Sequence, residues 1–589
     1  MKYSNPRHIE PSTEVDGILY FAQRIEEMLF DYSIDLYKMP LLNTHGLARE
    51  YCKVVEKVSS GEIKEYQREI LFEEFLASFN DDIVLKENWG ISNIEFVTKS
   101  FGSSTQRVKD HTIAYVDSTL SNGRYYNWIV KTLLKYTKLP KEKKKIEAVI
   151  RCFIPELVSM GYDSEFIYTA LKQHFFNGDT INNTSLEKFL AIFDLKIHRY
   201  NVYFAVSPMV KHFREILENR LRLHFDDDGN FPLFKTHSNR IIVYFKDIKA
   251  PCPNSAARDA YNRLDIFFSF YKFVGDKKGL SIQKKAMVRE QDCAPVFVAS
   301  KKLSYNIIEN IDYSEIGALS DQLITGLLIN AEDEYSVLSK SIELHNTAIS
   351  ASDLKSGFLN FWSAVEILCQ GHTADSKIGP VLDVVLPILK KDYLVTQIQD
   401  FNKNLKDNLR KEDYEYILSE IKAAGCEKRK IFQLIFLEQY KDLRAEVLTK
   451  LANYPVLRSR LCLLSSMNTT KKLNTMICAY VQRVKWHIYR MYRTRNAIVH
   501  SGEVPRNLKY LGEHLHSYLD STANEFIVKL AGDIPFSSRE DVITDVKFAI
   551  ANLDSILEKD APIDEKIIDV LIHPEIGYIM NCEDHLRTE

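Results

Sequence analysis

The sequence has no excess of charge of either sign. Its 589 residues include 77 Lys and Arg against 80 Asp and Glu, for a net charge of −3. A protein that coats nucleic acid through a general positive field needs a strong basic excess. That class is therefore excluded, and any contact with nucleic acid must be local.

Cysteine pairs and long apolar runs are also missing. The nine cysteines are scattered and form no CxxC, which favours reduced thiols over disulfides or a cysteine zinc site. The N-terminus is polar and carries no signal-peptide core. The longest apolar runs are much shorter than the roughly 20 residues that span a bilayer. We therefore expect a cytoplasmic protein without membrane contact.

Glycine-rich phosphate loops are absent too, so the sequence does not indicate nucleotide hydrolysis. No cofactor and no metal is expected. His514 and His516 are two residues apart on a predicted helix, so their side chains point apart and do not favour a shared metal.

What is present is the pattern of a large, mainly α-helical, multidomain protein. A chain of this length exceeds what one hydrophobic core organises, and 45% of its residues are hydrophobic. Apolar residues three and four apart predict helices in the N-terminal region, including one that begins near residue 208 and is closed by a turn at 226–232. Short β-branched and aromatic runs at 239–253 and 293–305, with a helix between them, predict a small α+β segment.

The helical pattern then continues to the C-terminus. The predicted organisation is a helical sensing or regulatory region over 1–230, the α+β segment over 231–310, a helical domain over 311–535 and a helical tail over 536–589.

The longest well-patterned helix covers 479–500, "AYVQRVKWHIYRMYRTRNAIVH". Its apolar stripe consists of Val484, Ile488, Met491 and Ile498. Arg495 lies on the same stripe, so its guanidinium must reach solvent or bind a partner, because burying an unpaired charge is costly.

A second stripe on this helix brings together Arg493, Asn496 and His500. Ser501, Gly502 and Pro505 predict the end of the helix, which places His500 in its last turn. The helix dipole favours a cation at that end. A histidine can transfer protons and an arginine can bind a phosphate through two hydrogen bonds, as RNA cleavage requires.

The spacing of these residues is weak by itself. A chain with 16 histidines contains an arginine and a histidine at such spacing about once or twice by chance. The same residues could be structural. The basic run "RVKWHIYRMYRTR", with Lys485 and Arg490, is typical of a local RNA-binding surface and equally of a solvated helix face.

The motif "YRTRNAIVHSG" resembles the R-x4-6-H signature of HEPN domains, in the form R-N-x3-H followed by Gly. The upstream helix "GFLNFWSAVEILC" and the following "LKYLGEHLHSYLDSTANEFI" are similar to the helices around that signature in the Apea-like HEPN group of bacterial anti-phage defence proteins. The resemblance implies a metal-independent endoribonuclease, a toxin-like effector that forms a homodimer with a composite RNA cleft. It also implies a phage-derived trigger or a regulatory partner.

By position in the motif, Arg495 and His500 match the invariant catalytic pair and Asn496 the polar neighbour. Arg493 fits the longer spacing, so which arginine contacts phosphate stays open. Glu366 matches an acidic position on the upstream helix and is the expected partner of Arg495. The insert between the two helices is longer than in the compact form of the domain. Two alternatives are a non-catalytic HEPN binding module and an all-α scaffold or regulatory protein.

Overall fold

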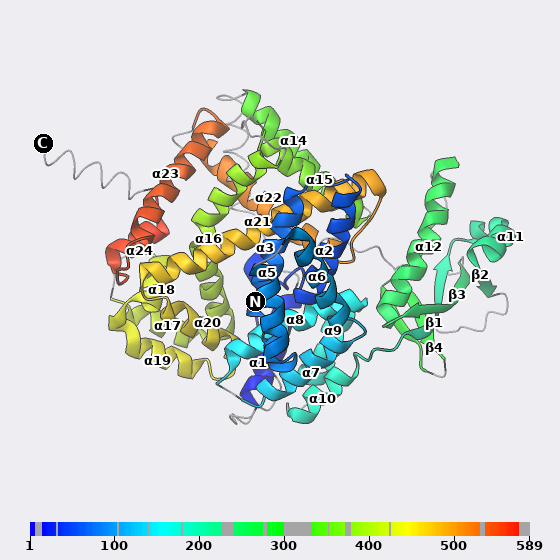
Figure 1. The fold of residues 1–589 in the computed structure, drawn as a ribbon, viewed down its shortest axis with the longest axis horizontal. Coiled ribbons are helices and arrows are strands. Elements are labelled where there is room, and N and C mark those ends of the chain that lie inside the picture. Colours follow the sequence, from blue (N-terminus) through cyan, green and yellow to red (C-terminus); the bar gives the residue numbers. More distant parts are fainter. Residues whose placement is uncertain are drawn as a thin grey trace, which may run out of the picture.

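The computed structural model confirms a mainly helical chain with a small five-stranded antiparallel sheet in its middle region (Figure 1). The structure describes residues 1–5, 15–30, 33–102, 105–139, 141–177, 181–226, 240–274, 280–283, 285–291, 293–299, 332–351, 353–370, 378–422, 426–530 and 536–575. Among these residues, no helix is both long and apolar enough to cross a membrane.

The N-terminal region is built from short helices with side-chain caps. Asn43, Asp82 and Asp163 each accept a hydrogen bond from a backbone N–H of the first helical turn that follows. The helices are α1 (Asp16–Leu29), α2 (Thr44–Ser59), α3 (Tyr66–Asp81), α4 (Ile83–Asn88), α5 (Ile91–Gly102), α6 (Gln106–Leu120), α7 (Arg124–Tyr136), α8 (Lys143–Met160), α9 (Ser164–Leu171) and α10 (Asn183–Ala191), with a 3₁₀ turn η1 (Asp35–Tyr37) after α1.

The sheet lies to one side of the helical body (Figure 1), and its strand order is β2-β3-β1-β4-β5. The strands are β1 (His198–Val206), β2 (Leu223–Asp226), β3 (Ile241–Ala250), β4 (Lys285–Glu290) and β5 (Val296–Ala299). The predicted helix between the strands is α12 (Pro253–Val274), which packs against the sheet through alanine and leucine side chains that are fully buried.

Two expectations for this region need correction. The sheet begins at His198 rather than near residue 231. The helix predicted from residue 208 to the turn at 226–232 is broken: 3₁₀, α and π turns follow one another up to Leu221, and then Arg222 adopts a left-handed conformation (φ 54°) before β2 begins. A left-handed residue reverses the chain and ends a helix. The predicted strand 293–305 is β5 where it is described, and its end lies outside the described residues.

The C-terminal part is again helical. Its helices are α14 (Glu332–Ser350), α15 (Leu354–Leu368), α16 (Gly379–Asn408), α17 (Lys411–Glu420), α18 (Glu427–Phe436), α19 (Lys441–Lys450), α20 (Pro455–Ser466), α21 (Thr470–Ser501), α22 (Leu508–Leu530), α23 (Arg539–Leu557) and α24 (Glu565–Ile572).

Two large hydrophobic cores organise these helices, and each draws on more than one of the predicted segments. The first core combines α1–α10 with the second half of α16, α17–α20, the start of α21, the end of α23, and α24. The second core combines α14, α15, the first half of α16, the second half of α21, α22 and the start of α23. Most of the long insert therefore packs with the N-terminal region, while its first part, up to Leu389 of α16, packs with α15, α21 and α22 in the second core.

Candidate functional site

Helix α21 has the amphipathic face and the end that the sequence predicts. Thr469 caps its start, and Gly502 ends it in a left-handed conformation with φ 70°. All four residues of the predicted apolar stripe are buried: Val484, Ile488, Met491 and Ile498. They pack against α15 and α22 in the second core, and the ring of Trp362 on α15 lies 6.1 Å from that of Tyr492. The sequence motif therefore lies on a helix that is fixed by its neighbours.

Two arginines of this helix are buried against the N-terminal region. Arg490 donates from Nε to Glu50 (2.9 Å) and from Nη1 and Nη2 to the carboxylate of Glu74 (3.0 and 2.7 Å). Arg493 donates to Gln67 and Glu50, both at 3.1 Å. Paired guanidinium–carboxylate bonds of this kind fix geometry as well as charge.

The carboxylates and guanidinium groups of this cluster neutralise each other. Burial opposes ionisation of Glu50, but Arg490 and Arg493 outweigh that effect and lower its pKa to about 2. Arg490 is 3% exposed and Arg493 is 8% exposed. Neither Arg490, a predicted RNA contact, nor Arg493, a predicted catalytic or supporting residue, faces solvent, because α2 and α3 cover them. In this arrangement both arginines hold the N-terminal region on α21.

Arg495 is placed differently. It is half-buried, and its Nη1 donates to Oδ1 of Asn496 at 3.2 Å. Within the described residues no carboxylate forms an ion pair with Arg495, and the expected pairing with Glu366 is not made. Arg495 therefore has a positive charge that no acid in the described part of the chain neutralises, next to the amide of Asn496.

His500 is exposed in the last turn of α21, where the sequence predicts it. Cationic side chains lie near the residues that follow this end of the helix. Glu503, just beyond it, pairs with Lys57 of α2, and hydrogen bonding from Lys57 together with the charge of Lys53 lowers the pKa of Glu503. Arg506 is exposed and donates to the carbonyl of Ser159 at 2.8 Å.

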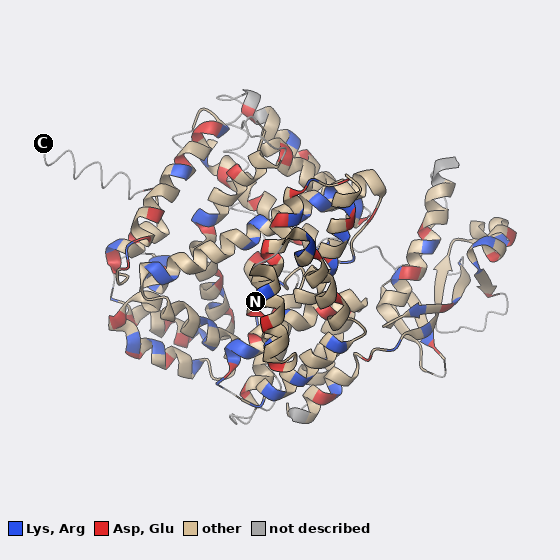
Figure 2. Ribbon diagram, in the orientation of Figure 1, with Lys and Arg blue, Asp and Glu red and all other residues tan. Residues whose placement is uncertain are grey.

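Sequence reasoning did not identify Lys53, Lys57 or Arg506 as part of this end. The two lysines come from α2, far from the motif in sequence, so no local pattern could show them. Lys485 is half-buried on α21 and has no ion pair within the described ranges. Elsewhere on the ribbon, basic and acidic residues are interspersed (Figure 2).

The two histidines of α22 behave as their spacing predicts and point to different neighbours. His514 bonds Asp35 through Nδ1, in a buried group with His487. The Nε2 atoms of His516 and His345 lie 2.9 Å apart. A cavity of about 150 Å³ lies beside these groups, between η1, α16, α21 and α22. It is lined by none of the predicted catalytic residues, so it is a separate feature.

No protein-family model matches this chain, and neither a curated protein nor a solved structure matches it. The functional conclusion must therefore come from the residues themselves.

Proposed function

We propose that this protein is a metal-independent endoribonuclease of the HEPN type and a toxin-like effector of anti-phage defence. One observation carries the proposal. At the end of α21, an exposed histidine follows closely on an arginine that no described carboxylate neutralises. The same helix pairs its other buried arginines with acids. A cation without an acidic partner among the described residues, five positions before an exposed imidazole, suits a phosphodiester better than it suits a purely structural role.

In the proposed reaction the ribose 2′-hydroxyl attacks the adjacent phosphorus and the 5′-oxygen leaves. A 2′,3′-cyclic phosphate and a 5′-hydroxyl are formed. His500 transfers protons at this step, and Arg495 binds the phosphate oxygens on which charge develops. Asn496 orients the guanidinium through the 3.2 Å hydrogen bond. Since Arg493 is bound by Glu50 and Gln67, Arg495 is the arginine that we assign to phosphate.

The surroundings of His500 support an RNA path that differs from the basic run on α21. Lys53 and Lys57 lie near Glu503, three residues after His500, and Arg506 follows three residues later, so all three are candidates to contact the phosphates on either side of the cleaved bond. Val499 and Val504 flank His500 and are 50% and 48% exposed. Apolar residues around a polar site fit the proposed homodimer, in which two such helix ends form one cleft.

The test compares the wild type with His500→Ala and Arg495→Ala, expressed in a bacterial host. We expect RNA cleavage and growth arrest with the wild type, and a loss of cleavage of roughly 10²–10⁴-fold in His500→Ala, the usual contribution of a general acid–base group. His573→Ala is the matched control, since His573 is an exposed histidine at the end of α24.

Sequencing of RNA ends identifies the substrate and the cyclic phosphate together. The same set of RNA ends in cells with the wild type and with folded His500→Ala would contradict the nuclease proposal. If both proteins bind RNA equally and cut none, the alternative of a non-catalytic binding module gains support. If neither the wild type nor His500→Ala binds RNA, the alternative of an all-α scaffold gains support.

A further inference from the structure

Helix α22 contributes histidines to two separate groups of metal-ligand type. Asp35, His487 and His514 form one group, and His345, His516 and Asp520 form the other. Within each group, one ligand atom from every residue lies within 4.8 Å of the others. The two groups differ in burial, in the charges already present and in access to solvent.

The first group is an internal hydrogen-bond network. Asp35 bonds His514 and also lies 3.4 Å from a guanidinium nitrogen of Arg483. His487 shares a hydrogen bond of 2.9 Å with the hydroxyl of Tyr518. All three members are buried. A divalent ion here would sit beside a buried guanidinium that already neutralises the carboxylate, so this group does not favour a metal.

The second group has the spacing of a tetrahedral site. The Nε2 atoms of His345 and His516 are 2.9 Å apart, and Nε2 of His345 lies 3.4 Å from Oδ1 of Asp520. Nδ1 of His516 lies 3.3 Å from Oδ2 of Asp520. Zinc binds its ligands at about 2.0–2.2 Å, so neighbouring ligand atoms of a tetrahedral ion lie about 3.3 Å apart. One imidazole binds an ion through a single nitrogen, so His516 would use either Nε2 or Nδ1. Rotations of the His516 and Asp520 side chains would then bring one ligand atom of each residue, now within 4.8 Å of the others, to one ion.

The helices hold these side chains in place. His516 and Asp520 are four residues apart on α22, which puts them on one face of the helix. His345 approaches from α14. The buried ring of Phe361 on α15 lies 5.8 Å from the His345 ring and 5.0 Å from the His516 ring, so both imidazoles pack on a rigid surface. A fixed second layer of this kind is what orients metal ligands.

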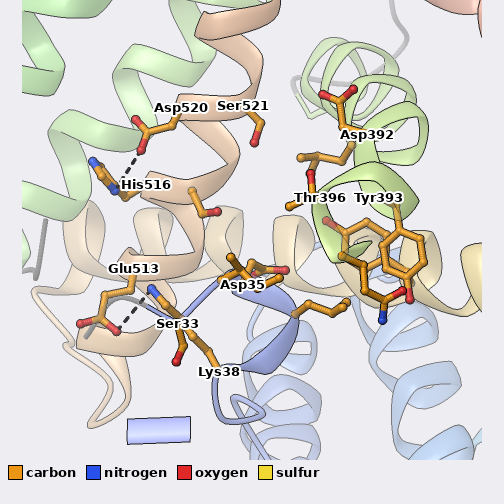
Figure 3. A pocket seen from close by; sticks show the side chains of 16 residues that line it. Ser33, Asp35, Lys38, Asp392, Tyr393, Thr396, Glu513, His516, Asp520 and Ser521 are labelled. Atoms are coloured by element: carbon orange, nitrogen blue, oxygen red, sulfur yellow. Dashed lines mark ion pairs between the residues drawn. The ribbon is translucent and has the colours of Figure 1, made fainter. Parts of the chain in front are cut away.

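The group is also open on one side. The side chain of Asp520 is 51% exposed, and those of His345 and His516 are 25% and 13% exposed. His516 and Asp520 line the cavity of about 150 Å³ together with Ser517 and Ser521 (Figure 3). The nearest lysine in this wall, Lys38, lies 4.0 Å from the carboxylate of Glu513 and is balanced by it.

We propose that His345, His516 and Asp520 bind one divalent transition-metal ion of the zinc class. The ion links α14 to α22 and keeps a coordination position for water or for a small anionic ligand in the cavity. Two imidazoles with one carboxylate select zinc, cobalt or nickel over magnesium and calcium.

This inference goes beyond the proposed nuclease and does not rest on it. The ring of His514, two residues before His516, lies 4.8 Å from that of His487. The rise of about 1.5 Å per residue puts His487 about 20 Å from His500 along α21. The metal therefore lies far from the proposed cleavage site and takes no part in that reaction.

The experiment uses the full chain, freed of metal with a chelator and titrated with Zn²⁺ in a calorimeter. We expect one Zn²⁺ per chain, at least tenfold weaker binding in His345→Ala and in Asp520→Asn, and a rise in melting temperature with Zn²⁺ that both variants lose. Visible absorption of bound Co²⁺ reports nitrogen and oxygen ligands. His111→Ala is the matched control, since His111 is an exposed histidine on α6.

Asp520→Asn changes a half-exposed side chain, so this variant keeps the test valid if His345→Ala does not fold. Absence of Zn²⁺ and Co²⁺ binding by the folded wild type would overturn the proposal, because the two imidazoles would then simply share a proton. Binding that is lost in Asp35→Asn and retained in Asp520→Asn would also overturn it, by placing the ion in the buried group.

Discussion

The arginines on two neighbouring turns of α21 differ in burial and in their partners. Arg490 and Arg493 are buried and bound by Glu50, Glu74 and Gln67. Arg495, half a turn further on, is half-buried and bonded only to Asn496 among the described side chains. A buried guanidinium must be paired, whereas one near solvent can keep its charge for a ligand. Which arginine is structural and which is available therefore depends on what covers it.

The largest expected difference is in stability. Arg490→Met leaves the carboxylate of Glu74 buried without its partner, which is expected to lower the free energy of unfolding by about 3–5 kcal/mol. Arg495→Met removes no ion pair with any residue that the structure describes and is expected to cost less than about 1 kcal/mol. Urea denaturation of both variants measures the difference. Equal losses of unfolding free energy in the two variants would contradict the difference in pairing between Arg490 and Arg495.

Acid should weaken the buried pairing selectively. The pKa of Glu50 falls from 4.5 to about 2 on folding, so its contribution is complete above pH 4.5 and is lost as the pH falls toward 2. The contribution is on the order of 3 kcal/mol. Unfolding is compared between the wild type and Glu50→Gln at pH 6, 5, 4 and 3. We expect the advantage of the wild type to shrink with acid; a constant advantage would contradict the role of this carboxylate.

The exposed end of α21 should respond to its backbone. Gly502 has φ 70°, and a Cβ there would meet nothing within 4 Å. Gly502→Ala therefore adds strain but no clash, and is expected to cost about 1 kcal/mol. Gly102→Ala is the matched control: it has the same open space without the left-handed backbone, and is expected to be neutral or to stabilise by up to about 1 kcal/mol. The melting temperatures of both variants test this expectation. Equal shifts in melting temperature would contradict the argument that Gly502→Ala strains the backbone.

The smallest effect is expected at the surface ion pair beside His500. Lys57 and Glu503 have side chains 26% and 48% exposed. Lys57→Gln is expected to change the free energy of unfolding by less than about 1 kcal/mol, and high salt should remove even that difference. Denaturation at low and high salt measures it. A loss of unfolding free energy as large as that in Arg490→Met would show that the Lys57–Glu503 pair is as deeply buried as the ion pairs of Arg490.

The sequence predicted the local features of α21 because they depend on nearby residues. The apolar stripe follows from helical spacing, and the end follows from Gly502, whose left-handed conformation closes the helix. Burial of Arg490 could not be predicted, since its partner Glu50 lies 440 residues earlier. The expectation that Arg495 is the arginine of the apolar face was only partly right, because Arg493 is the more buried of the two.

The missed strands have two different causes. "HRYNVYFAV" in β1 is rich in aromatic and β-branched residues, so the signal was present in a region that otherwise has a helical pattern. β2 is short and directly follows a helical pattern, which ends only because Arg222 turns left-handed. The histidine pair was not predictable, because His345 and His516 are 171 residues apart in the chain.

The shared first core also has a consequence during synthesis. Its N-terminal helices are translated first, but the core is completed by Ile568 and Leu571 of α24, near the other end of the chain. The nascent N-terminal region therefore leaves the ribosome with part of its apolar surface uncovered. Contacts across such long separations slow folding, and open apolar surface invites aggregation and chaperone binding. Loss of α24 should therefore first weaken the helices that it contacts, α16, α18 and α23, and reach the N-terminal helices only through the core that they share.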